Sequence, residues 1–120
     1  MDNAIVVEGK APAVSDITSA DPLTLNPSDN PYSSLPRSSV IAYGLSKDCE
    51  VIIKIYDKYN NAVRTLLNAE SRNAGANTEI WDCRNDNGIL VPDGDYRVDI
   101  QAKSGDDYSI VRSASVFVYY

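Results

Sequence analysis

The residues best suited to chemistry in this 120-residue chain are four aspartates close together in the sequence, Asp82, Asp86, Asp93 and Asp95. Ca²⁺ prefers several oxygen ligands, carboxylates among them, so one interpretation is a calcium site that uses Asp82, Asp86 and Asp93. The other is structural, because aspartate side chains in turns accept hydrogen bonds from nearby backbone N–H groups. We favour turns and therefore predict no required cofactor or metal, with Ca²⁺ as the one ion worth testing.

The remaining residues do not indicate catalysis. Histidine is absent, which removes the commonest general base and the commonest transition-metal ligand together. The serine pairs Ser33-Ser34 and Ser38-Ser39 have no base partner, and no Gly-x-Ser-x-Gly segment occurs. Two cysteines far apart in the sequence are too few for a zinc site. The sequence therefore predicts a protein that is not an enzyme, with no catalytic and no cofactor-binding residues.

Length and composition are typical of one small all-β domain. A chain of this length can bury one modest core, and eight tyrosines among many valines, isoleucines and threonines favour strands. The net charge of −6 argues against nucleic acid and anionic membrane surfaces, which both attract lysine and arginine. No apolar run approaches the ~20 residues of a membrane span. Because the start at Met1-Asp2-Asn3 is acidic and no secretion signal follows it, we interpret the chain as a mature or excised piece.

The chain divides near residue 38. Residues 1–37 contain five of the six prolines and only brief apolar runs, which predicts an extended arm or linker. Within this arm Ile5, Val6 and Val7 could pair as a strand, and Leu23-Thr24-Leu25 is a second candidate. Residues 38–120 alternate between apolar and polar side chains, which is typical of half-buried strands. Strands are predicted at 39–45, 49–57, 62–68, 77–83, 95–103 and 108–118.

The alternation also predicts the core of an antiparallel β-sandwich. Val51, Ile53 and Ile55 share one face of their strand, and Val98 and Ile100 share one face of theirs. Trp81 ends a strand and packs inward in one interpretation; in the other its flat ring is a sugar-stacking platform, and we favour the core. The predicted core residues are Val51, Ile53, Ile55, Leu66, Trp81, Tyr96, Val98 and Ile100.

The two cysteines are predicted to lie at opposite ends of the sandwich. Cys49 opens one strand, and Cys83 closes another strand that runs in the same direction, so a strand length of roughly 20 Å separates them. A disulfide needs Cα atoms within about 7 Å, which excludes a bond within the chain. The thiols are then free, buried, or paired between molecules.

The stretch from Trp81 to Tyr96 contains two turns, Asp86-Asn87-Gly88 and Asp93-Gly94, of the kind that joins antiparallel strands. Together with the residues before it, this stretch resembles the Ig-like domain of the bacterial flagellar hook-assembly scaffold, the FlgD-like Ig family. Cys83 stands where that family usually has glycine, and Asn60-Asn61 replaces a usual glycine in a hairpin turn. The matching residues are Ile55-Tyr56-Asp57, Val63-Arg64-Thr65-Leu66, Ala74-Gly75, Trp81-Asp82, Val91-Pro92-Asp93-Gly94 and Tyr96.

The resemblance implies an all-β, immunoglobulin-like or fibronectin-III-like sandwich of about seven strands, preceded by the extended arm. It also implies a non-catalytic structural or interaction module of an exported bacterial surface or appendage assembly, with a scaffold, stalk or hook-cap-like role. The expected location is extracellular or on the cell surface, and the expected partners are proteins or further copies of the chain. The resemblance names no particular partner, because one scaffold carries many functions.

Two alternative functions remain open from the sequence. In the first, the chain is the subunit of an extracellular filament: Ile5, Val6 and Val7 add a strand to a neighbour's sheet, and Cys49 and Cys83 lock successive subunits together. In the second, the chain is a carbohydrate-binding accessory domain of a secreted hydrolase. That function requires several aromatic rings on one face, drawn from Trp81 and the tyrosines at 56, 59, 96, 108, 119 and 120.

Overall fold

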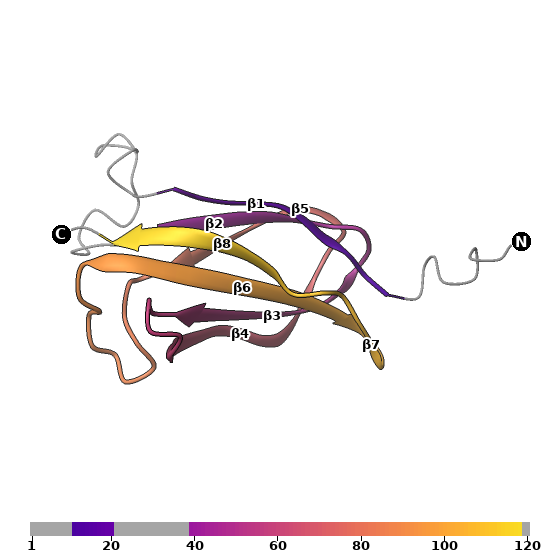
Figure 1. Ribbon diagram of the computed structural model, residues 1–120. Coiled ribbons are helices and arrows are strands. Elements are labelled where there is room, and N and C mark those ends of the chain that lie inside the picture. Colours follow the sequence, from indigo (N-terminus) through magenta and orange to yellow (C-terminus); the bar gives the residue numbers. More distant parts are fainter. Residues whose placement is uncertain (1–10, 21–38, 119–120) are drawn as a thin grey trace, which may run out of the picture.

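The computed structural model describes residues 11–20 and 39–118 of the chain, and within them the backbone forms eight strands and no helix (Figure 1). Accordingly, the described residues contain no helix long and apolar enough to cross a membrane. The strands are β1 (Val14–Ala20), β2 (Ser39–Leu45), β3 (Cys49–Tyr56), β4 (Ala62–Arg72), β5 (Gly75–Trp81), β6 (Gly94–Ser104), β7 (Asp107–Tyr108) and β8 (Arg112–Val118).

The strands form two antiparallel sheets that pack face to face. One sheet has the order β1-β2-β5. The other has the order β4-β3-β6, and both β7 and β8 pair with the remaining edge of β6 (Figure 1). The all-β antiparallel sandwich predicted from the sequence is therefore confirmed. The predicted strand at 108–118 is interrupted, because Ser109, Ile110 and Val111 lie outside both β7 and β8.

The strand β1 lies within residues 1–37, which the sequence predicted to be an extended arm. It pairs antiparallel with β2 of the same chain, from Val14 opposite Leu45 to Ala20 opposite Val40. The sequence analysis did not predict this strand. The strand candidates at Ile5, Val6 and Val7 and at residues 23–25 lie outside the described residues, as do Tyr119 and Tyr120.

The core lies between the two sheets, and it contains seven of the eight residues predicted for it. The exception is Leu66, which is only partly buried, whereas its neighbour Leu67 is buried. The cause is a β-bulge: Leu67 pairs with Ile53 and Thr65 pairs with Lys54, so Leu66 is an extra residue without an opposite partner. A bulge reverses the alternation of side chains, and strict alternation therefore gave the wrong residue at this position.

Trp81 is the largest fully buried side chain in the described residues, with 0% of its surface exposed. Its ring packs edge-on against Tyr96, with the ring centroids 5.7 Å apart and an angle of 68° between the planes. The indole Nε1 donates a hydrogen bond to the backbone oxygen of Arg84 at 3.0 Å. The core interpretation of Trp81 is thus confirmed, and Trp81 is not a sugar-stacking platform.

We expect Trp81→Ala to lower the free energy of unfolding by about 3–5 kcal/mol, because the change removes a fully buried ring and leaves a cavity. Urea denaturation followed by circular dichroism measures the loss. Ile89→Ala is the matched control, since Ile89 is exposed and its truncation should change stability by at most about 0.5 kcal/mol. A loss below about 1 kcal/mol for Trp81→Ala would contradict the burial of the ring.

Candidate functional site

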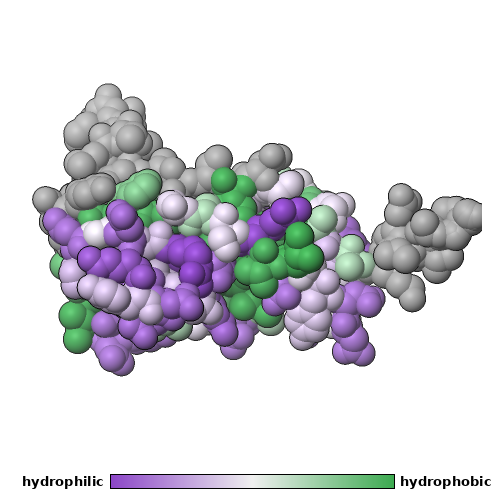
Figure 2. Space-filling model, in the orientation of Figure 1, coloured by the Kyte–Doolittle hydropathy of each residue, from purple (hydrophilic) through white to green (hydrophobic). Residues whose placement is uncertain are grey.

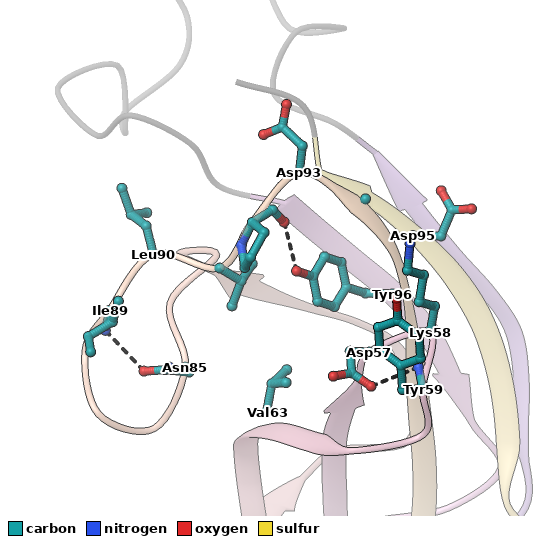
Figure 3. A pocket seen from close by; sticks show the side chains of 13 residues that line it. Asp57, Lys58, Tyr59, Val63, Asn85, Ile89, Leu90, Asp93, Asp95 and Tyr96 are labelled. Carbon is teal, nitrogen blue, oxygen red and sulfur yellow. Dashed lines mark hydrogen bonds between the residues drawn. The ribbon is translucent and has the colours of Figure 1, made fainter.

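Two loops at one end of the sandwich border a pocket of about 540 Å³, which we call the loop-end pocket (Figure 3). One loop is the β3–β4 turn at residues 57–61, and the other is the β5–β6 loop at residues 82–93. The wall is mostly apolar and includes Val63, Leu90, Val91, Pro92 and Tyr96. The rim carries three carboxylates and one ammonium group, from Asp57, Asp93, Asp95 and Lys58. An apolar concavity with a few polar groups is the usual form of a binding site.

The β3–β4 turn is organised by the side chain of Asp57. Its Oδ1 accepts hydrogen bonds from the backbone N–H groups of Tyr59 and Asn61, both at 2.9 Å. Asn60 has a φ of 71°, a left-handed conformation that asparagine tolerates well, in the hairpin turn where the FlgD-like pattern usually has glycine. This turn leaves the ring of Tyr59 74% exposed beside the pocket.

The β5–β6 loop is a small hairpin organised by Asn85. Its Oδ1 accepts hydrogen bonds from the backbone N–H groups of Asn87 at 2.9 Å and Ile89 at 3.0 Å. Gly88 takes a φ of 81° between them, and a β-bridge between Arg84 and Leu90 closes the hairpin. The loop therefore holds Ile89, which is 62% exposed, across the pocket from the end of β3 (Figure 3).

Arg64 of β4 anchors the β5–β6 loop to the sandwich. Its Nη1 donates to Asp82 Oδ1 and to the backbone oxygen of Arg84, each at 3.0 Å. Asp86 adds a second connection: its backbone N–H donates to the Val63 oxygen at 3.0 Å, and its Oδ1 accepts from the Thr65 N–H at 3.0 Å. The loop thus covers the outer edge of β4 along Val63 and Thr65, where unpaired backbone groups would otherwise be available for pairing.

The structure does not bring the calcium candidates together. Asp82 and Asp86 both face Arg64, whereas Asp93 lies on the rim of the loop-end pocket. The residues that the structure describes include no group of three His, Cys, Asp or Glu side chains arranged to hold a metal ion. Asp82 Oδ1 also accepts from the Arg84 N–H at 3.1 Å, two residues further on, which is the local bond of a turn-forming aspartate.

The two cysteines lie at opposite ends of the sandwich and form no disulfide with each other. Cys83 follows β5 and lies beside Ser39, with its Sγ 4.0 Å from the Ser39 Oγ. Cys49 opens β3 at the other end, opposite Arg72, and is half-buried. Burial, followed by the charge of Asp48, raises the pKa of the Cys49 thiol.

Cys83 adopts a φ of 60° although it is fully buried and is not glycine. A left-handed conformation costs an L-residue with a Cβ about 1–2 kcal/mol. This position is the one at which the FlgD-like pattern usually has glycine, the residue that adopts a left-handed conformation without a Cβ penalty.

The tyrosines proposed for carbohydrate binding do not share one face within the described part of the chain. Tyr59 lies at the loop end, and Tyr108 lies in β7 at the opposite end. Tyr96 is buried, and its hydroxyl donates to the Pro92 oxygen at 2.7 Å. The guanidinium group of Arg97 lies over the ring of Tyr56 at 4.5 Å from its centroid. The described tyrosines therefore form no flat platform of several rings.

The two antiparallel sheets and the loop end define an Ig-like β-sandwich, and residues 37–106 match the FlgD Ig-like domain family. The chain therefore belongs to the FlgD Ig-like domain family, a non-catalytic scaffold family. Among solved structures it is similar to the crystal structure of FlgD from P. aeruginosa, with 17% identity and a TM-score of 0.58. The match covers 85% of this chain and 65% of that chain, and it shows a common fold. No curated protein matches.

Most of the residues that carry the family resemblance lie at the loop end, whereas Ala74-Gly75 lie at the other end of β5. Arg64, from the Val-Arg segment, is bonded to Asp82, from the Trp-Asp segment. Val91, Pro92 and Tyr96 line the pocket itself. The sequence analysis did not predict the roles of Arg64 and Asn85. Only the recurrence of Val-Arg and Trp-Asp within one family pattern signalled that Arg64 and Asp82 belong together.

We expect the contribution of Asp57 to stability to depend on pH. The N–H groups of Asn61 and Tyr59 lower the pKa of Asp57 below its ordinary value of 3.8. A lowered pKa gives stability that is present above the unfolded-state pKa and is lost as the pH falls through the folded-state pKa. The difference in melting temperature between the native protein and Asp57→Asn should be constant above about pH 5 and should shrink below about pH 4. A difference that grows on acidification would contradict this assignment.

We expect Cys83→Gly to be more stable than Cys83→Ala by about 1 kcal/mol, because only glycine adopts the left-handed conformation without a Cβ penalty. Urea denaturation compares the two variants, which lose the same buried sulfur. Two further substitutions are matched controls. Ala69→Gly, at a φ of 59°, should stabilise the protein, whereas Ala62→Gly, outside the left-handed positions, should destabilise it. The reverse order at Cys83 would show that no strain is stored there.

Proposed function

We propose that this chain is a non-catalytic structural and interaction module of an exported bacterial surface or appendage assembly, with a scaffold, stalk or hook-cap-like role. The observation that carries this proposal is the family match over residues 37–106. The similarity to FlgD from P. aeruginosa supports the fold on which it depends. The match covers only 65% of the P. aeruginosa chain. A role like that of a whole FlgD protein is therefore part of the proposal.

Protein partners fit the surface of the domain better than the other partner classes do. The net charge of −6 disfavours nucleic acid and anionic lipid. Exposed Tyr59 and Ile89 flank an apolar pocket, and a tyrosine beside an aliphatic residue is typical of the apolar centre of a protein interface. The loop end is therefore the surface that we assign to partner binding.

The two alternative functions have less support. A carbohydrate-binding role required Trp81 or several tyrosines on one face, and Trp81 is buried. A filament joined by the arm would need the arm to pair with a neighbour's sheet, whereas β1, which lies within the arm, pairs with β2 of the same chain. Neither alternative is favoured by an observation of its own.

Labelling of intact cells tests the proposed location and role. An antibody raised against the domain should label the surface or an appendage of unpermeabilised cells of the source bacterium, and deletion of the encoding gene should abolish the label. A known cytoplasmic protein, visible only after permeabilisation, is the control. Label confined to permeabilised cells would overturn the proposal.

A further inference from the structure

The edge strands of the two sheets differ in how their unpaired backbone groups are protected from another chain. The pairing of β4 with β3 shifts register at three places, and Asp86 covers the outer edge of β4. The strand β1 has one register shift and lies against β8. Bulges, lysines and prolines on an edge are common devices against pairing. The strand β5, which pairs only with β2 within the described residues, has none of them: its seven residues form one unbroken register, without lysine, arginine or proline.

The one charged residue of β5, Glu79, is neutralised within the domain. It pairs opposite the buried Ile41, so its side chain faces the core side of the sheet. Its carboxylate accepts two hydrogen bonds from Arg72 of β4, at 2.8 and 3.1 Å. It accepts a third at 2.7 Å from the hydroxyl of Tyr43, whose pKa is raised by burial and by this bond. The edge of β5 therefore offers backbone groups to a partner without an unbalanced charge.

The outer face beside this edge is uncharged as well. Opposite residues of an antiparallel pair share a face, so the outer face of β2 and β5 consists of Val40, Ala42, Gly44, Ala76, Thr78 and Ile80. A hollow of about 460 Å³ along these strands is also lined by uncharged residues. The outer face of the other sheet differs, since Lys54 lies opposite Asp99 there, and Figure 2 shows hydrophilic residues over much of the near side of the molecule. A charged side chain placed beside β5 would find no partner of opposite charge on the face of β2 and β5.

The space along β5 suits one added strand. The strands β4 and β5 belong to different sheets, and a turn at Asn73 and Ala74 joins them at the end of the sandwich that carries β7 (Figure 1). Asn77 Nδ2 donates to the backbone oxygen of Asn73 at 2.8 Å, which holds this turn against β5. A second copy docked edge to edge would bring its own β4 and its own 82–93 loop to the same side of the sandwich. A single extended segment brings neither, so the edge favours a segment over a whole domain.

We propose that the edge of β5 from Ala76 to Ile80 binds an extended segment of a protein partner. The backbone of the segment pairs with β5, and its side chains are uncharged and small or β-branched. Main-chain hydrogen bonds supply the affinity, and the uncharged face beside the edge selects the side chains. This contact goes beyond the proposed function, because it assigns a second binding surface away from the loop-end pocket and names the kind of segment that it takes.

Amide hydrogen exchange followed by NMR on the full 120-residue chain tests the strand addition. The probe is the acetylated peptide Ser-Val-Ser-Val-Ser-Val-Ser. In the free chain, every second N–H group of β5 is bonded to β2 and should be protected, whereas the alternate N–H groups face the edge and should exchange fast. With a dissociation constant of about 0.5 mM, the peptide at about 5 mM should slow this alternate set about tenfold.

Two altered peptides separate backbone pairing from other kinds of binding. A copy that is N-methylated at every amide should slow none of the β5 amides, because it has no N–H group to donate. A copy with lysine in place of valine should bind at least about tenfold more weakly than the uncharged peptide. The net charge of −6 would by itself attract the lysine peptide, so the order of the two affinities shows whether the uncharged edge decides the binding.

Two matched variants locate the contact. Asn77→Lys places a charge on the core side of the edge, an arrangement that natural proteins use against strand addition, and it should weaken peptide binding at least about tenfold. Asn68→Lys places the same charge at an exposed position of β4 and should bind like the native chain. Equal melting temperatures show that both variants keep the fold, and the N-methylated peptide tests the pairing on the native chain independently of them.

Several results would overturn the strand addition. Protection of both sets of β5 amides in the free chain would mean that another part of the chain, or a second copy, already occupies the edge. An alternate set that the peptide does not slow, or that the N-methylated peptide slows equally, would exclude backbone pairing. Tighter binding of the lysine peptide would contradict the preference for uncharged side chains. None of these results would change the surface labelling that tests the proposed function.

Discussion

One carbonyl group, the backbone oxygen of Arg84, connects the core of this domain to its loop end. It accepts hydrogen bonds from the buried indole of Trp81 and from the guanidinium of Arg64, each at 3.0 Å. A buried indole N–H without a partner would be costly, so the position of Arg84 is imposed by the largest side chain in the core. Arg64 brings the same loop against β4. The β5–β6 loop is consequently held by the core and by the neighbouring sheet together, which is why a twelve-residue connection can present a defined pocket wall.

Local backbone conformation decides which side chains the loop end presents. Asn60 and Gly88 take left-handed conformations at the tips of the two loops, and these turn the chain so that Tyr59 and Ile89 face outward on either side of the pocket. Side-chain acceptors, Asp57 in one loop and Asn85 in the other, satisfy the backbone N–H groups that such tight turns leave unpaired. The apolar exposure at this end therefore results from turn chemistry in which the left-handed residues Asn60 and Gly88 each lie in a turn stabilised by a side-chain acceptor.

The sequence predicted the sandwich, most strands and most of the core because alternation at period two survives in β3 and β6, where Val51 and Val98 point inward as expected. The prediction was wrong or incomplete where the structure depends on pairing between segments that are distant in the sequence. The bulge at Leu66 has no compositional signal, since two adjacent leucines fit either register. The strand β1 has a mixed polar sequence without clear alternation, and it is recognised as a strand by its pairing with β2. Within the site, the turn residues were predicted. The bond between Arg64 and Asp82 was not, because it joins β4 to a loop 18 residues further along the chain, and periodicity does not reveal such a contact.

The edges and the ends of the sandwich differ in the groups that they offer to another chain. Asp86 covers β4 along Val63 and Thr65, so backbone pairing with another chain is blocked there. On the other side β1 and β8 lie against each other across the two sheets (Figure 1). Edge pairing, the commonest uncontrolled contact between β-proteins, is thereby restricted at these edges. The loop end is different, because exposed Tyr59 and Ile89 flank the mostly apolar loop-end pocket there. Contacts at the loop end depend on side-chain identity, so selection can adjust them without altering the sheets.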